Sequence, residues 1–156
     1  MPINQESNGT RESVGHRLSD VIEVRLPLKA DYLSVLRATV GVLAGEMSFN
    51  YDEIIQLRVA ISEAFSMAVR WYTEAGPIPA STELAVRELA VRFIVEPDRL
   101  EILIPNPGDP QTPSPLEDDI ESQALLESLM DEVEFGGRES GKALVRMAKH
   151  KSASGD

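Results

Sequence analysis

Apolar residues recur along the chain with two different periods. In residues 21–28 apolar and charged side chains alternate, which is typical of a strand with one buried face. Apolar side chains three and four positions apart then predict a helix with Asp31 as its N-cap and a buried stripe of Leu33, Leu36, Val40 and Leu43. A second, longer helix is expected from Asn50 or Asp52 to about Tyr72, with a stripe of Ile54, Leu57, Ile61, Phe65 and Ala68.

The second half of the chain predicts two hairpins and a third helix. The two strand pairs, each joined by a turn, are residues 84–95 with 99–104 and residues 133–135 with 143–147. A short helix is expected over residues 120–130. Residues 105–119 hold five prolines, which neither a helix nor a central strand tolerates, so they predict an exposed loop. This order of elements predicts an α+β two-layer sandwich, a mostly antiparallel sheet with helices on one face.

The patterned part of the chain is long enough for one domain. Residues 1–19 and 150–156 are polar and aperiodic, and we expect both to be disordered tails. The domain is therefore expected to span residues 20–149 of the 156.

The amino-acid composition excludes several kinds of functional site. The chain has no cysteine, which excludes a disulfide framework, a thiol nucleophile and a cysteine-based zinc site. The two histidines, His16 and His150, lack the spacing of a ligand pair, so no metal site is expected. No apolar run approaches the roughly 20 residues of a membrane helix, and the N-terminus has no secretory signal, so we expect a cytoplasmic protein.

The net charge of −11 affects which classes of partner the protein attracts. Such a charge repels nucleic acid and anionic membranes and attracts a basic protein. The alternative is that acidity serves solubility alone.

Three strings, in this order and spacing, carry a resemblance to a known family. They are LPLKADYLSVLRATVGVLAGEM, YDEIIQLRVAISEAFSMAVRW, and DRLEILIPNPGD with ESLMDEVEF downstream. The chain resembles the bacterial anti-sigma factor serine kinases of sporulation and general stress response, which belong to the histidine-kinase-like ATPases. The resemblance implies that fold, a homodimer, and regulation of transcription by binding a sigma factor and an anti-anti-sigma factor. It also implies Mg-ATP as the cofactor for phosphorylating a serine of the anti-anti-sigma factor.

The resemblance assigns catalytic and cofactor positions on the second helix. Glu63 matches the general base of the family, and the other interpretation is an ordinary ion-pair partner of Arg70 or Arg58. Four residues on, where the family has an asparagine that ligates magnesium, this chain has Met67. A thioether is a poor ligand for a cation that prefers oxygen, so the resemblance implies that the metal loses an anchor here.

Two further segments that the resemblance assigns to the nucleotide site also depart from the family pattern. Asn106 stands where an aspartate receives the adenine amino group, while Gly108 matches the glycine that follows. Residues 118–123 match the glycine-rich phosphate loop, but they contain no glycine and three carboxylates. These departures predict a degenerate ATP site.

The partner-binding face is better preserved. Arg37 matches the arginine through which the family contacts its protein partners, and Ser34 and Gly41 share its side of the first helix. We expect Arg37 to be exposed and to contact a partner. An ordinary solvated arginine is the other interpretation.

Three functions remain open at this point. The first is a regulator that binds a sigma factor or an anti-anti-sigma partner without kinase activity, which makes it a pseudokinase. The second is an active serine kinase with an altered pocket, and the third is an unrelated α+β binding module.

Overall fold

Five antiparallel strands form one sheet in the order β1-β2-β3-β5-β4. The computed structural model describes residues 19–74, 88–106, 119–136 and 143–153. Within them the strands are β1 (Asp20–Pro27), β2 (Glu88–Val95), β3 (Arg99–Pro105), β4 (Glu132–Phe135) and β5 (Ala143–His150). The two predicted strand pairs are confirmed, because β2 pairs with β3 and β4 pairs with β5.

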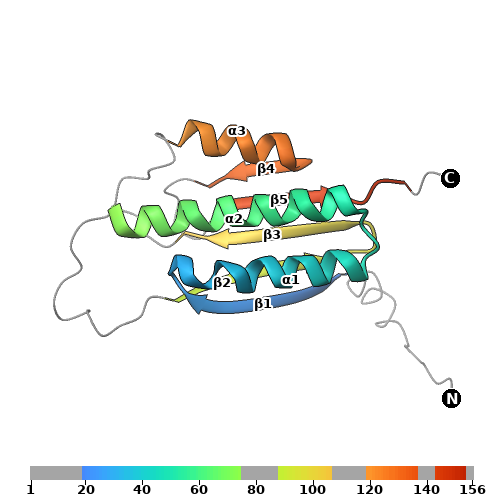
Figure 1. Ribbon diagram of the computed structural model, residues 1–156, viewed down its shortest axis with the longest axis horizontal. Coiled ribbons are helices and arrows are strands. Elements are labelled where there is room, and N and C mark those ends of the chain that lie inside the picture. The colour runs from blue at the N-terminus through green and yellow to red at the C-terminus, as the bar shows by residue number, and fades with distance from the viewer. Residues whose placement is uncertain (1–18, 75–87, 107–118, 137–142, 154–156) are drawn as a thin grey trace, which may run out of the picture.

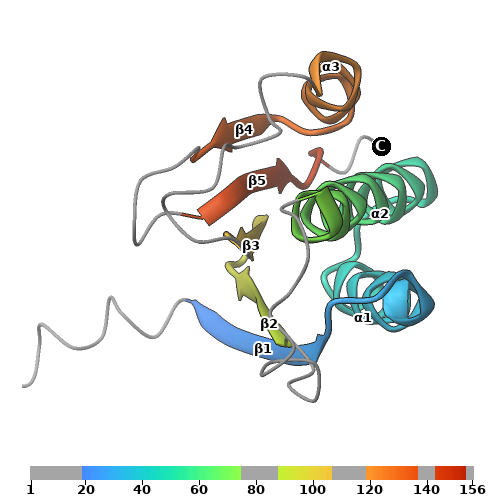
Figure 2. The same cartoon turned by 90° about the vertical axis from the view of Figure 1, so that its left-hand side faces the viewer.

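Among the described residues, three α-helices lie on one side of this sheet. They are α1 (Leu33–Glu46), α2 (Tyr51–Glu74) and α3 (Ile120–Leu129). Figure 2 shows the two layers nearly end-on, with α1 and α2 side by side over the sheet and α3 next to α2. The predicted two-layer α+β sandwich is confirmed, and the arrangement is that of a histidine-kinase-like ATPase fold.

The first helix begins differently from the prediction. A short 3₁₀ turn, η2 (Ala30–Tyr32), precedes α1, and Asp31 lies inside it. Tyr32 is therefore the N-cap residue of α1, and no side chain caps this end. The prediction of Asp31 as the cap is wrong because the 3₁₀ turn already takes up the first free backbone groups.

The second helix begins with a reciprocal cap. The amide oxygen of Asn50 accepts a hydrogen bond from the backbone N–H of Glu53 at 2.8 Å, and the Asn50 N–H donates to the Glu53 carboxylate at 2.9 Å. This is a capping box, which satisfies two backbone donors that a helix end would otherwise leave unpaired. Of the two predicted caps, Asn50 is confirmed.

The predicted stripes of α1 and α2 form the core. Their central members are fully buried against the inner faces of β2, β3 and β5, while Leu33, Leu43 and Ile54 are half-buried at the edges. The buried members are Leu36, Val40, Leu57, Ile61, Phe65 and Ala68.

The opposite face of the sheet carries charges. Glu101, only 3% exposed, accepts hydrogen bonds from Arg99 at 3.0 Å and from Arg146. Arg99 also donates to Glu132 of β4 at 2.9 Å, and Glu132 in turn contacts His150 of β5. Alternation along the strands puts these groups opposite the apolar face.

The end of β5 corrects one boundary. The tail was expected from residue 150, but His150 is the last residue of β5 and the Ser152 N–H donates to Glu53 at 2.9 Å. Most of the proline-rich loop, all but the last residue of the expected N-terminal tail, and the last three residues of the chain lie outside the described residues. In the parts of the chain that the structure describes, no helix combines the length and apolar character needed to cross a bilayer.

Candidate functional site

One end of the fold brings Glu63, which the resemblance assigns to catalysis, to the start of α3. α2 and β3 both end there, and α3 begins there (Figure 1). Glu63 and Arg70 lie two turns apart on α2, so both side chains are on the side that faces the start of α3.

Arg70 is the centre of a polar network between these elements. Its Nη2 atom lies 3.5 Å from Oε1 of Glu63 and 3.3 Å from both carboxylate oxygens of Asp119. The same nitrogen donates to the Ser122 hydroxyl at 3.1 Å. Ser122 in turn donates to Oε1 of Glu63, so that one oxygen is engaged from both helices. The network ties α3 to α2 with a cation supplied by the chain itself.

The other residues that the resemblance assigns to the nucleotide site differ in how deeply they are buried. Met67 is 1% exposed and belongs to the apolar core. Asn106 is half-buried directly after β3, and Gly108 lies outside the described residues. The structure brings Glu63 together with the α3 start but leaves Met67 facing the core.

The stretch that matches the phosphate loop is described from residue 119. The Asp119 side chain forms no cap bond with α3 and pairs with Arg70 instead. Within the described ranges, no three histidine, aspartate or glutamate side chains form a set that could hold a metal ion.

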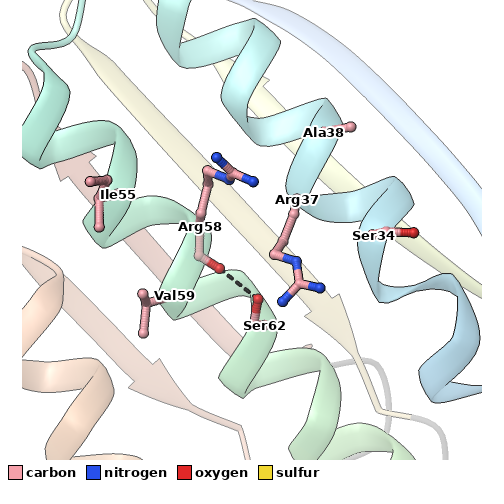
Figure 3. Close-up of a pocket in the computed structure, with 7 residues that line it drawn as sticks. All are labelled: Ser34, Arg37, Ala38, Ile55, Arg58, Val59 and Ser62. Atoms are coloured by element: carbon pink, nitrogen blue, oxygen red, sulfur yellow. Dashed lines mark hydrogen bonds between the residues drawn. The ribbon is translucent and has the colours of Figure 1, made fainter.

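A second site lies on the outer side of the helix layer. A pocket of about 600 Å³ runs between α1 and α2, and we call it the arginine groove. Figure 3 shows its lining residues, with the side chains of Arg37 and Arg58 in the space between the two helices: Ser34, Arg37, Ala38, Ile55, Arg58, Val59 and Ser62.

Arg37 and Ser34 thus share a groove as well as a helix face. Arg37 is half-buried, so the prediction that it is exposed holds only in part. Gly41 lies beside the groove, where a Cβ atom would meet Cδ of Arg58 at 3.9 Å. The stem of Arg58 therefore crosses from α2 to the glycine of α1.

Comparison with known proteins identifies the family. The chain is 34% identical over 131 residues to the serine-protein kinase RsbW of Bacillus subtilis, covering 74% of this chain and 77% of that protein. It is 33% identical over 147 residues to the serine-protein kinase RsbW of Bacillus velezensis, covering 84% and 86%. The chain belongs to the RsbW family. No family model matches the sequence.

The RsbW relationship confirms the resemblance drawn from the three strings. The Bacillus licheniformis RsbW, at 33% identity over 133 residues, covers 75% of this chain and 78% of its own length. About three quarters of this chain is therefore shared with a protein named as a serine-protein kinase.

The sequence did not reveal the roles of three residues in these two sites of the RsbW-like fold. Ser122 was not singled out, because it acts through Glu63 and Arg70 on another helix. Arg58 was considered only as an ordinary partner of Glu63, not as part of the groove. Arg70 was considered only as an ordinary partner of Glu63. Its spacing of seven residues from Glu63 was the available signal, since two helical turns return to the same face.

Proposed function

We propose that this chain is an anti-sigma-factor-like regulator of bacterial transcription. It binds a sigma factor, an anti-anti-sigma factor or both, and it does so without phosphorylating its partner. Membership of the RsbW family supports the regulatory part of this proposal. The Ser34 and Arg37 side of α1 is the surface we assign to partner binding, with Gly41 beside it.

The position of Arg70 is the observation that carries the absence of kinase activity. Its guanidinium is held by Glu63, Asp119 and Ser122, so a fixed positive charge sits where the family resemblance places the base and the phosphate loop. A buried thioether at Met67 offers no oxygen ligand to magnesium. These residues are a poor fit for a magnesium nucleotide.

An active serine kinase is the second candidate. Glu63 is kept, and the relatives are named serine-protein kinases. A kinase would require Arg70 to leave Glu63 when nucleotide and partner bind.

Two measurements on the full chain separate these functions. The first is calorimetric titration with Mg-ATP, and the second is transfer of labelled phosphate from ATP to a purified anti-anti-sigma factor. The Bacillus subtilis RsbW, assayed alongside with its own substrate, is the positive control. We expect no binding up to millimolar Mg-ATP, no transfer, and sigma-factor binding that is unchanged when ATP is omitted. Micromolar, magnesium-dependent binding together with transfer to serine would establish the kinase instead.

We further propose that the protein works as a cytoplasmic homodimer that does not bind nucleic acid directly. The family resemblance supports the dimer, and the net charge of −11 opposes contact with phosphate backbones. Sedimentation equilibrium on the purified chain tests the dimer directly.

A further inference from the structure

The arginine groove differs from the rest of the described surface in its charge balance. Most described arginines lie within 4.0 Å of a carboxylate: Arg25, Arg70, Arg92, Arg99 and Arg146. Arg37 and Arg58 are the two that form no ion pair with a described residue, and they line one groove. The chain has a net charge of −11, yet neither of these two cations forms an ion pair within the described residues.

Two like charges in one groove repel each other, and a bound anion removes that cost. Guanidinium groups hold a carboxylate through paired, charge-assisted hydrogen bonds, which fix its direction as well as its position. The local charge is thus opposite to that of the whole molecule, so the groove selects an acidic group even though the overall charge attracts a basic protein.

The walls of the groove are apolar and open to solvent. Ile55 is 40% exposed and Val59 is 41% exposed, and both lie on the α2 side. A small inorganic anion would leave this surface uncovered, whereas a protein segment with apolar side chains beside its carboxylate would bury it.

We propose that the arginine groove binds an aspartate or glutamate side chain of the protein partner, with Arg58 acting as a second arginine beside Arg37. The partner segment carries apolar residues next to this carboxylate, and they cover Ile55 and Val59. The proposal rests on the proposed function, because it names the chemistry of the partner at the surface assigned there.

The test uses the full chain and the sigma factor and anti-anti-sigma factor of the same organism as probes. Arg37→Met and Arg58→Met remove one groove cation each, and Arg92→Met is the matched control. Arg92 is an exposed arginine paired with Glu23 on the sheet, away from the groove. Thermal melting of all three variants establishes that they fold.

We expect each groove variant to weaken partner binding about tenfold or more, as for a central interface arginine, and Arg92→Met to change it less than about twofold. The binding of the parent chain should weaken with salt. If Arg58→Met binds like the parent while Arg37→Met does not, the second arginine has no role and the inference is wrong.

A second measurement locates the partner without removing a charge. The sequence has no cysteine, so a single introduced thiol gives an unambiguous signal. The partner should slow maleimide labelling of Ser34→Cys, in the groove, and leave labelling of Ser128→Cys on α3 unchanged. Equal labelling rates with and without bound partner would place the interface elsewhere.

The outcomes also separate this inference from the proposed function. Binding of a sigma factor that ignores both groove arginines would keep the function and reject the groove. Failure of both probe proteins to bind the parent would reject both. Calorimetric binding of inorganic phosphate to the groove as tight as that of the partner would show an anion site in place of a docking surface.

Discussion

The guanidinium of Arg70 lies 3.5 Å from the Glu63 oxygen that also accepts a hydrogen bond from Ser122. The helices α2 and α3 are separated in the sequence by β2 and β3, and one carboxylate oxygen joins them. The chain supplies a cation, an acceptor and a hydroxyl donor at the position where the family resemblance expects a nucleotide.

The first prediction concerns this junction. Ser122→Ala should lower the free energy of unfolding by about 1–2 kcal/mol, because Glu63 and Arg70 each lose a hydrogen-bond partner in a part-buried place. Ser128→Ala is the control, since that residue is exposed and its hydroxyl donates to the Leu125 carbonyl of its own helix. Its effect should stay within about 0.5 kcal/mol. Urea denaturation measures both, and equal effects would mean that the junction adds nothing to stability.

The second prediction concerns Met67. Restoring the asparagine of the family with Met67→Asn should lower the free energy of unfolding by about 1–3 kcal/mol, because an amide would enter an apolar core without a partner. We expect no Mg-ATP binding by this variant, because Glu63 stays paired with Arg70 and residues 118–123 still lack the glycines of a phosphate loop.

Trp71 provides the readout for that experiment. It is the only tryptophan of the chain, it is 1% exposed, and it lies one helical turn after Met67. Its fluorescence, with calorimetry, should report any ligand that enters nearby. Met67→Leu is the control of similar volume and should cost less than about 1.5 kcal/mol. A stable Met67→Asn variant that binds Mg-ATP would show that this single residue disables a competent site.

The third prediction concerns the two glycines of α1. Gly41→Ala should stabilise the fold by up to about 1 kcal/mol, because alanine is the better helix former and its Cβ would meet Arg58 at an ordinary contact of 3.9 Å. Gly45→Ala meets no atom within 4 Å and lies near the helix end, so a smaller gain is expected. The melting temperatures of the two variants and the parent measure these changes in stability. A loss of stability in Gly41→Ala alone would mean that the Arg58 stem packs too tightly to yield.

The fourth prediction concerns acid stability. Hydrogen bonds from Arg99, and then from His150, lower the pKa of Glu132 from 4.5 to about 2. A lowered folded-state pKa means that the stabilisation is fully present above the unfolded pKa of 4.5 and is lost as the pH falls toward 2.

The side chain of Glu132 is half exposed, so its contribution should not exceed about 1 kcal/mol. Glu132→Gln should therefore cost stability at pH 7 and much less near pH 2. Carboxyl NMR titration gives the pKa directly. Glu134→Gln, on the same strand and without an ion pair to a described residue, should show no such pH dependence. A Glu132 carboxyl that titrates near its ordinary value would contradict the assigned contacts.

The sequence by itself determined the class of fold and the order of its elements. The stripes of α1 and α2, the alternation of β1 and the two hairpins are local patterns, and local patterns follow from the period of each element. The three strings also carried the resemblance to the anti-sigma factor serine kinases, which the comparison with RsbW confirms. They singled out Glu63 and Arg37 as candidates, because matching positions along a chain needs no coordinates.

Only the tertiary structure decided what these residues contact. The junction of Arg70 with Asp119 and Ser122 joins positions about fifty residues apart, and the meeting of Arg37 with Arg58 depends on how α1 packs against α2. Helix packing sets such distances through side-chain shape across the interface, which no local period encodes. The same reason explains why the 3₁₀ turn before α1 and the ordered end after β5 escaped prediction, since both depend on contacts made elsewhere in the fold.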